Sequence, residues 1–209
     1  MKKQLNKTHL APHFYTDCIE AGCDEAGRGC LAGSVYAAAV ILPSDYDNPL
    51  LNDSKKLSPK LRSQLRDEII RDAVAWAIGV VTPEEIDQIN ILNASFLAMH
   101  RALDQLSVRP EAIIVDGNRF NPYHDIPHTT IVKGDGKYQS IAAASILAKT
   151  FRDEYMDSLA EEYPYYDWQS NKGYPTRAHR EGLRLHGPSP YHRMSYNLVG
   201  TKQLELEFK

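Results

Sequence analysis

The chain has 209 residues, of which 24 are Lys or Arg and 27 are Asp or Glu, so its formal net charge is −3 at pH 7. This length predicts one domain with at most a small appendage, and 43% hydrophobic residues exclude a disordered chain. The longest apolar stretch, residues 35–42, is far shorter than the roughly 20 residues of a membrane span. We therefore expect a cytoplasmic protein with no membrane partner, and we take it to be a monomer.

The slightly acidic charge balance bears on nucleic-acid binding. A protein that coats nucleic acid non-specifically needs an excess of basic side chains, which this chain lacks. A nucleic-acid partner would have to be held by a local basic patch or through metal ions.

Five segments have the composition of β-strands. Residues 17–24, 32–42 and 74–81 are largely apolar, and Gly or Pro flanks the first two. Two short apolar runs, 112–115 and 129–132, are each followed within a few residues by an Asp next to a Gly. Such runs are typical of buried strands, and here we expect acidic groups at their carboxyl ends.

Four helices are predicted from their start signals or their periodicity. Ser58-Pro59 and Thr82-Pro83 each place a capping hydroxyl before a proline at the first helical position. Residues 90–107 continue as a further helix, and residues 137–161 carry one apolar stripe. Residues 142–145 are small, so we expect this last helix to lie close against the strands.

The order of the elements predicts an α/β fold with a mixed central sheet flanked by helices, because a meander of strands precedes strands that alternate with helices. After residue 164 the composition shifts to Tyr, Gly, His and Arg, which indicates a small C-terminal helical region. We therefore divide the chain into an N-terminal extension (1–16), a core (17–163), the C-terminal helical region (164–200) and a tail (201–209).

Four carboxylates lie at the predicted carboxyl ends of strands. Asp24 and Glu25 follow the first strand, and Asp116 and Asp135 end two later ones. In open α/β sheets such groups collect in one crevice, where repulsion raises their pKa values unless cations neutralise them. Oxygen ligands without His or Cys favour Mg²⁺ or Mn²⁺, and two such ions suit phosphodiester hydrolysis. Asp116 alone would be an ordinary turn residue, but three acidic strand ends favour a metal site.

Six segments of the chain, in order, resemble the motifs of one family. They are Cys23-Asp24-Glu25-Ala26-Gly27-Arg28-Gly29, Asp53-Ser54-Lys55-Lys56-Leu57, Val115-Asp116-Gly117, Lys133-Gly134-Asp135 with 141–149, Gly173-Tyr174-Pro175-Thr176, and His192-Arg193-Met194-Ser195-Tyr196. Each is weak alone, but the ordered set, from about residue 17 to 197, resembles bacterial ribonuclease HII, a type 2 ribonuclease H.

The resemblance implies a ribonuclease H-like fold and a metal-dependent endonuclease. Such an enzyme hydrolyses the RNA strand of RNA/DNA hybrids. It also cuts 5′ of single ribonucleotides embedded in duplex DNA, leaving 3′-hydroxyl and 5′-phosphate ends, with a role in ribonucleotide removal during DNA replication and repair. By the motif matches, Asp24, Glu25, Asp116 and Asp135 would be the catalytic residues and the ligands of two Mg²⁺ or Mn²⁺ ions. The core would be catalytic, and the C-terminal helical region would bind substrate.

Gly27-Arg28-Gly29 and Tyr174 are candidates for sensing the sugar. The 2′-hydroxyl distinguishes RNA from DNA, and glycines let the backbone approach it closely while Arg28 supports or contacts phosphates. Tyr174 resembles the family tyrosine that packs on the sugar following the ribonucleotide. The alternatives are a tight turn after the first strand and an ordinary core or surface aromatic.

Two basic segments are candidates for phosphate binding. Ser54, Lys55 and Lys56 precede a capped helix, where a hydroxyl, amides and ammonium groups can hold a phosphate; the alternative is a solvated charge pair. Residues 170–200 hold five basic side chains, Arg193 among them as a substrate-binding candidate, and one acid. This segment supplies the local basic patch, unless it is a plain solvated helix face.

Two features depart from the family pattern or extend it. Met194 and Tyr196 stand where the family usually has Arg and Phe, which leaves the acids untouched. The tail, Gln203 to Phe208, resembles the glutamine-leucine-phenylalanine peptides by which DNA-processing proteins bind a sliding clamp. A terminal strand or a frayed end is the alternative interpretation of this tail.

Three other functions remain open at this point. A junction resolvase on the same fold would cut branched DNA that lacks ribose. Ribonuclease HIII usually has an extra N-terminal domain and a different residue in place of Arg28, whereas about 16 residues precede the first predicted strand here. A metal-free nucleic-acid binding module would have lost catalysis, which four intact acids disfavour.

Overall fold

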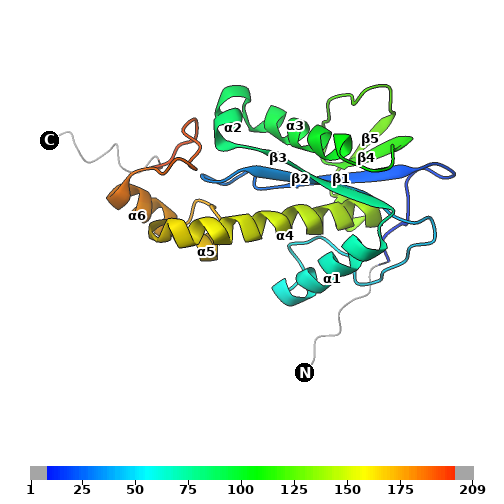
Figure 1. Ribbon diagram of the computed structural model, residues 1–209, viewed down its shortest axis with the longest axis horizontal. Coiled ribbons are helices and arrows are strands. Elements are labelled where there is room, and N and C mark those ends of the chain that lie inside the picture. The colour runs from blue at the N-terminus through cyan, green and yellow to red at the C-terminus, as the bar shows by residue number, and fades with distance from the viewer. Residues whose placement is uncertain (1–8, 201–209) are drawn as a thin grey trace.

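A five-stranded mixed sheet forms the centre of the molecule (Figure 1). The computed structural model describes residues 9–200. The strands are β1 (Glu20–Ala26), β2 (Val35–Ile41), β3 (Ala75–Val81), β4 (Ala112–Asp116) and β5 (His128–Ile131). They lie in the order β3-β2-β1-β4-β5; β1 to β3 form an antiparallel meander, and β1, β4 and β5 are parallel. The predicted mixed sheet is therefore confirmed.

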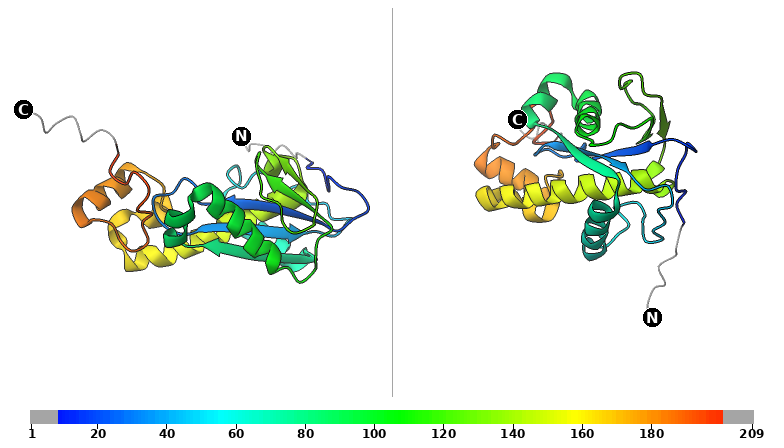
Figure 2. Two further views of the ribbon diagram at one scale, coloured as in Figure 1. Left: turned by 90° about the horizontal axis from the view of Figure 1, so that it is seen from above. Right: turned by 45° about the vertical axis from the view of Figure 1, so that its right-hand side comes forward.

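Helices cover both faces of the sheet. They are α1 (Pro59–Asp72), α2 (Pro83–Ile89), α3 (Ile91–Asp104), α4 (Gln139–Glu162), α5 (Trp168–Asn171) and α6 (Arg177–His186), with one-turn 3-10 helices η1 (Gly134–Gly136) and η2 (Pro164–Tyr166). Helices α2 and α3 lie on one face, and α1 and α4 on the other; α5 and α6 sit at one end, beside the C-terminal half of α4 (Figures 1 and 2).

The predicted helix starts are confirmed by their caps. The Ser58 hydroxyl accepts a hydrogen bond from the backbone N–H of Leu61, three residues into the segment that forms α1. The Thr82 hydroxyl accepts one from the N–H of Glu85, whose carboxylate in turn accepts from the N–H of Thr82. This reciprocal capping box satisfies two backbone donors at the start of α2.

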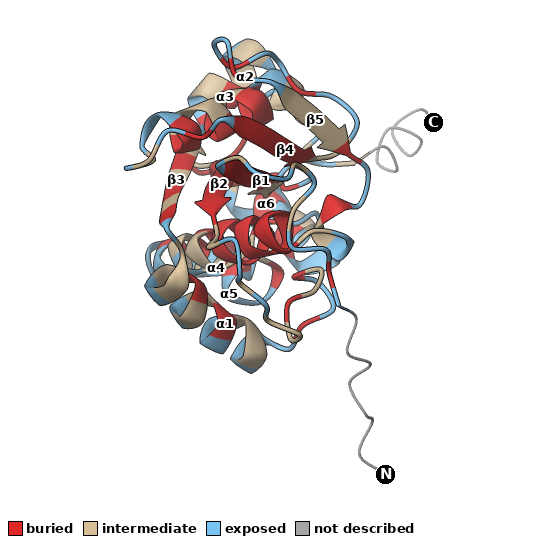
Figure 3. Cartoon of the chain, turned by 90° about the vertical axis from the view of Figure 1, so that its right-hand side faces the viewer, coloured by how far each residue is buried: buried red, intermediate tan, exposed pale blue. Residues whose placement is uncertain are grey.

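Strand β2 shows how the sheet separates two hydrophobic cores. Because successive side chains of a strand point to opposite faces, Ala37, Ala39 and Ile41 pack on the side of α3. Ala38 and Val40 pack on the other side, with α1 and α4. The sheet is consequently covered on both faces, and its central strands are almost entirely buried (Figure 3).

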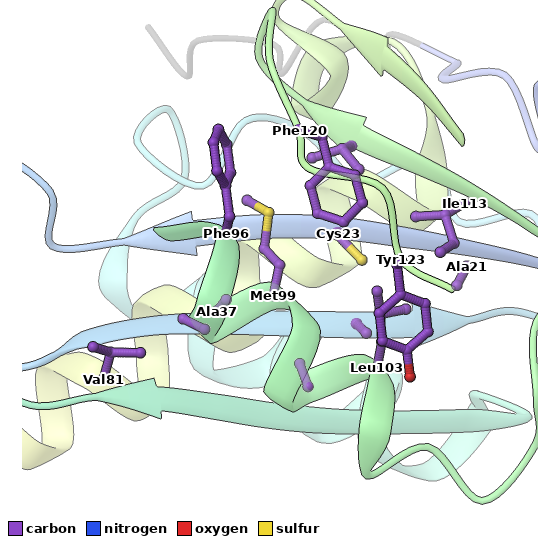
Figure 4. Packing of buried hydrophobic residues seen from close by; sticks show 14 of the residues in the cluster. Ala21, Cys23, Ala37, Val81, Phe96, Met99, Leu103, Ile113, Phe120 and Tyr123 are labelled. Carbon is purple, nitrogen blue, oxygen red and sulfur yellow. The ribbon is translucent and has the colours of Figure 1, made fainter. Parts of the chain in front are cut away.

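Side chains of α3 fill the first of these cores. Phe96, Met99 and Leu103 point from α3 toward the sheet (Figure 4). Phe120 and Tyr123, from the connection between β4 and β5, close the same cluster. This cluster covers the face of the sheet on which α3 lies.

Helix α4 lies very close to β1, as its small residues predict. Ala142, Ala143 and Ala144 are fully buried. On the facing strand, a Cβ atom added at Gly22 would lie 2.4 Å from the backbone carbonyl carbon of Ser140, so only a glycine allows this approach. The helix therefore runs directly beneath the strand that carries Asp24.

Two predicted strand ends differ from the structure. Strand β1 continues to Ala26, which pairs with Tyr36 of β2, so Asp24 and Glu25 lie within the strand rather than after it. Strand β5 ends at Ile131, and Asp135 lies in the 3-10 turn η1 instead of at the strand end. In both places the pairing of neighbouring strands, rather than local composition, decides where the strand ends.

The C-terminal helical region is attached to the end of α4. Met156 and Leu159 of α4 pack in one cluster with Trp168 and Leu183. The buried guanidinium of Arg152, also on α4, donates hydrogen bonds to three backbone carbonyls, those of Ala32, Ser34 and Lys172, at 2.9–3.1 Å. This helix thereby joins the sheet, the connection after β1 and the C-terminal region.

The described part of the N-terminal extension contacts the core. Leu10 is buried against the α4 side of the sheet, and the N–H of Ala11 donates to the carbonyl of Lys137 at 2.7 Å. None of the helices in residues 9–200 combines the length and apolar character needed to cross a membrane. The tail segment predicted to bind a clamp, 203–208, lies outside the described residues.

Candidate metal and nucleic-acid site

The parallel pairing of β1 and β4 brings two of the predicted acids side by side. Cys23 of β1 is in register with Val115 of β4, so the next residue on each strand is Asp24 and Asp116. Neighbouring parallel strands end at the same edge of a sheet, which places these carboxyl groups together. Register therefore places Asp24, which lies within β1, beside Asp116 at the end of β4.

The other two acids reach this edge by separate routes. Glu25 follows Asp24 on β1, and one of its carboxylate oxygens accepts a hydrogen bond from Arg28 at 3.2 Å. Asp135 lies next to Gly134, whose backbone N–H donates to the Asp116 carboxylate at 2.7 Å. That hydrogen bond ties η1 to the end of β4.

The pKa values of three acids show that their charges interact. Burial raises the pKa of Asp24 well above its ordinary value, and the charges of Glu25 and Asp116 raise it further. Burial also raises the pKa of Glu25. For Asp135, burial and then the charges of Asp116 and Asp53 raise the pKa. Like charges in poorly solvated positions have this effect, which a bound cation would reverse.

Lys55 is a basic residue that faces these acids. Burial by itself would lower its pKa, but the charges of Asp24, Asp53 and Asp135 raise it above its ordinary value. Lys55 therefore stays protonated and offsets part of the negative charge.

Two adjoining cavities share Lys55 and Asp116 and are lined by three of the four acids, whereas the buried Asp24 lines neither. One, of about 540 Å³, is also lined by Asp53, Lys56 and Asp135. The other cavity has a volume of about 670 Å³. It is lined by two residues of α4, Ser145 and Lys149, and by the predicted site residues Glu25, Gly27, Arg28, Gly29, Ser54 and Tyr174. Segments far apart in the sequence therefore meet around one site.

The donor set fits a hard divalent cation, since it consists of carboxylate oxygens without thiol or imidazole. Within residues 9–200, no group of three or more Asp, Glu, His or Cys side chains is already arranged to hold a metal ion. Glu25 is engaged by Arg28, and Asp116 by the N–H of Gly134. Each of these hydrogen bonds uses one oxygen of its carboxylate, so a cation could be ligated through the other oxygen without displacing it.

The Gly27-Arg28-Gly29 loop requires glycine at its first position. Gly27 has φ +98°, and a Cβ atom there would lie 2.1 Å from Nε of Arg152. At Gly29 the nearest atom to an added Cβ would belong to the Tyr174 ring, at 3.9 Å. The carbonyl of Gly173 accepts from the N–H of Leu31 at 2.8 Å, which holds Tyr174 beside the loop. Backbone and aromatic ring thus line one cavity wall.

Two residues of α4 belong to the site, although we did not select them from the sequence. The Ser145 hydroxyl lies 3.0 Å from that of Ser54, and both residues are buried. Lys149, one turn later, lines the same cavity; burial lowers its pKa, and its ammonium group contacts Asp153. The spacing of four residues on one helix face is the signal that could have identified the pair.

Arg193 is not positioned as a direct substrate contact. Its side chain is fully buried, and its Nε and Nη2 donate to the carbonyl of Gly33 at 3.0 and 2.8 Å. Its Nη1 donates to the carbonyl of Arg28 at 2.9 Å. The guanidinium supplies hydrogen-bond donors to carbonyls of the connection between β1 and β2. Arg193 therefore supports this loop from inside the protein.

The predicted basic patch is also smaller than the composition suggests. Besides Arg193, Lys172 contacts Asp157, and Arg184 forms a salt bridge with Glu181. Ion pairing within the protein therefore takes up part of the positive charge between residues 170 and 200.

The sequence and the fold match one family of known proteins. The family model described as Ribonuclease HII matches residues 21–199. Ribonuclease HII of Bacteroides thetaiotaomicron is 69% identical over 199 residues, covering 95% of this chain and 100% of that protein. The ribonuclease H2 structure from Pyrococcus horikoshii OT3 has a TM-score of 0.72 and 27% identity, covering 86% of this chain and 94% of that chain.

The PCNA:RNase HII complex from Archaeoglobus fulgidus also matches, with a TM-score of 0.72 and 27% identity over 88% of this chain and 98% of that chain. These matches confirm the ribonuclease H-like fold, and the family match favours ribonuclease HII over a junction resolvase or ribonuclease HIII. The chain belongs to the ribonuclease HII family and is a metal-dependent endoribonuclease that acts on the RNA of RNA/DNA hybrids.

Proposed function

We propose that this enzyme also cuts 5′ of a single ribonucleotide embedded in duplex DNA, leaving 3′-hydroxyl and 5′-phosphate ends, and thereby serves ribonucleotide removal during DNA replication and repair. The observation that carries the proposal is the shared wall of Gly29 and Tyr174 next to the acids. An enzyme that recognises one ribonucleotide must sense one 2′-hydroxyl and then the sugar that follows it. This wall offers a backbone donor for the first task and an aromatic ring for the second.

Asp24, Glu25, Asp116 and Asp135 would hold the divalent ions, with Mg²⁺ or Mn²⁺ as the proposed cofactor. When bound, a pair of such ions activates water and stabilises charge on the leaving oxygen. The chain's own part is to bring these carboxylates to one region; burial raises the pKa of Asp24, Glu25 and Asp135, so protons compete with cations for them.

The remaining residues would position the duplex. Lys55, protonated in the field of the acids, and Lys56 would contact backbone phosphates. Ser54 would support this segment through its contact with Ser145. Once cations neutralise the Glu25 carboxylate, the Arg28 guanidinium would exchange its hydrogen bond with Glu25 for one with a backbone phosphate. Each contact orients the scissile phosphate without reading base sequence.

A sliding clamp is the proposed protein partner of the tail. The notion rests on the resemblance of Gln203 to Phe208 to clamp-binding peptides. It is supported by the Archaeoglobus structure, which is described as a complex of a ribonuclease HII with PCNA. The catalytic unit itself is proposed to be a monomer in the cytoplasm.

The test is to map the cut on a duplex with one embedded ribonucleotide. We expect a cut on its 5′ side in Mg²⁺ or Mn²⁺, a 3′-hydroxyl on the upstream fragment, and no cut after chelation. An RNA/DNA hybrid is the positive control for family activity, and an all-DNA duplex and a branched DNA are the negative ones. Cleavage of the hybrid alone would reject single-ribonucleotide incision.

A further inference from the structure

The peptide group between Arg28 and Gly29 is held by two side chains of one C-terminal segment, the buried Arg193 and the partly exposed Tyr196. The carbonyl of Arg28 accepts hydrogen bonds from Nη1 of Arg193 at 2.9 Å and from the hydroxyl of Tyr196 at 3.0 Å. The guanidinium of Arg193 also lies over the Tyr196 ring, 5.3 Å from its centroid. One carbonyl is thus fixed by two donors that support each other.

This pair of donors is anchored independently of the loop that it holds. The backbone N–H groups of Met194 and Ser195 donate to the two carboxylate oxygens of Asp87 at 2.8 and 3.0 Å. Asp87 lies on α2, which packs with α3 on the sheet. The segment that carries Tyr196 therefore has a fixed position relative to the core.

Fixing the carbonyl also fixes the N–H of the next residue. A trans peptide group is planar, so the C=O of Arg28 and the N–H of Gly29 point in opposite directions. The N–H of Gly29 is consequently directed away from Arg193 and Tyr196, and it donates to no acceptor within residues 9–200. Gly29 lines the cavity beside Tyr174, so a backbone donor is available where the sugar would lie.

We propose that the Tyr196 hydroxyl, acting together with Arg193, is a positioning group that orients the Gly29 N–H toward the ribose 2′-hydroxyl. The inference rests on the proposed function, because it assigns a cause to the recognition of the ribonucleotide. An N–H that already points in the direction needed for binding loses little conformational entropy when the substrate binds. It favours only a substrate that has an acceptor at that position. Tyr196 therefore contributes to selectivity for ribose without touching the substrate.

The experiment compares Tyr196→Phe with a matched control, Tyr191→Phe. Both variants remove one hydroxyl from the same C-terminal segment and keep the ring. The Tyr191 hydroxyl has no hydrogen-bond partner within residues 9–200, and its ring packs on Tyr163 with centroids 5.6 Å apart. Two quantities are measured: kcat and KM on a duplex with one ribonucleotide, and the inhibition constant of the same duplex made entirely of DNA.

We expect Tyr196→Phe to lower kcat/KM on the ribonucleotide duplex by roughly three- to tenfold, the range for loss of one neutral hydrogen bond. The inhibition constant of the DNA duplex should stay unchanged, as should every value for Tyr191→Phe. An unchanged kcat/KM would overturn the proposal. An equal loss of affinity for both duplexes would overturn it as well, since the residue would then support general binding.

Different results would reject the proposed function and the positioning role of Tyr196. If the wild-type enzyme cleaves the hybrid but not the single-ribonucleotide duplex, the proposed function fails before Tyr196 is tested. If the wild type cleaves that duplex and Tyr196→Phe matches it with an equal melting temperature, only the positioning role fails.

Discussion

Asp24 is a buried carboxyl group next to two others, and this placement determines how the stability of the fold depends on pH. Because burial and the charges of Glu25 and Asp116 raise its pKa above the ordinary value, the folded chain binds this proton more tightly than the unfolded chain does. Its contribution to stability is full below the ordinary carboxyl pKa and is lost as the pH rises through the raised pKa. At a pH above this raised pKa, the charged carboxylate destabilises the fold unless cations neutralise it.

The Asp24→Asn variant should therefore lose activity and gain stability. We expect cleavage of an RNA/DNA hybrid to fall at least about 100-fold. Loss of a residue that only hydrogen-bonds to a metal ligand already lowers metal affinity or activity by about 10- to 100-fold. In chelator at pH 7 the variant should melt at a higher temperature than the wild type. Added Mg²⁺ should raise the melting temperature of the wild type more than that of the variant.

Glu85 offers a control with the opposite sign. Hydrogen bonds from Arg101 lower the pKa of Glu85 to about 2, so its contribution to stability is present above the ordinary carboxyl pKa and is lost as the pH falls toward 2. Glu85→Gln should lower the melting temperature at pH 7 with or without metal, and leave cleavage unchanged. A matching decrease for Asp24→Asn in chelator would contradict our account of the acidic site.

Protons and metal ions should compete for the same carboxylates. Since the pKa values of Asp24, Glu25 and Asp135 are raised, cleavage should decline on acidification at a pH above the ordinary carboxyl range. Raising the Mg²⁺ concentration should move the midpoint of this decline to lower pH, as seen in kcat/KM against pH at several metal concentrations. A midpoint independent of metal would show that these acids do not bind the ion.

At the scale of elements, α4 connects the catalytic core and the C-terminal region. Its first half packs beneath β1 through small buried residues, and its second half carries Met156 and Leu159 into the C-terminal cluster. Between them, Arg152 joins three carbonyls from both regions. The proposed boundary between core and C-terminal region follows α4, which ends at Glu162, but the packing on either side of it is continuous.

Replacing Arg152 by Met should expose the importance of this connection. The variant leaves the carbonyls of Ala32, Ser34 and Lys172 without their donor, and we expect a loss of roughly 2–4 kcal/mol in the free energy of unfolding. The measurement is urea denaturation. Arg71→Met is the control: Arg71 pairs on the surface with Asp72, and its loss should leave the midpoint unchanged. Equal midpoints for both variants would contradict the structural role of Arg152.

At the scale of the whole molecule, the net charge of −3 is compatible with a nucleic-acid enzyme because the acids are not evenly spread. Four of them form the candidate metal site, where bound cations would reverse the local field. Lys55 lines both cavities beside the acids, and Lys56 lines one of them. Composition alone excludes non-specific coating of nucleic acid, but it does not detect a site that becomes attractive to phosphate only with its cations.

The tail offers a prediction that separates catalysis from recruitment. A chain truncated after Lys202 keeps every described residue, so its cleavage of a short free duplex should equal that of the full chain. In a pull-down with the bacterial sliding clamp, the full chain should be retained and the truncated chain should not. Equal retention of both chains would remove the proposed role of residues 203–208.

The sequence by itself determined the order of the elements and the helix starts, and it selected the four candidate acids. These features are local: a hydroxyl before a proline caps a helix regardless of what lies elsewhere, as Ser58 and Thr82 do. The ordered motifs also identified the family, and the small residues at 142–145 predicted the close packing of α4.

Only the tertiary structure decided how far β1 extends, which acids are neighbours, and what the buried arginines do. The pairing of Ala26 with Tyr36 carries the strand past its acids, and register sets Asp24 beside Asp116. The sequence indicated a substrate contact for Arg193 and gave no role to Arg152. Both guanidinium groups are buried because they donate to backbone carbonyls that lie outside the strands and need donors. Which carbonyls need such donors is decided only when distant segments of the chain come together.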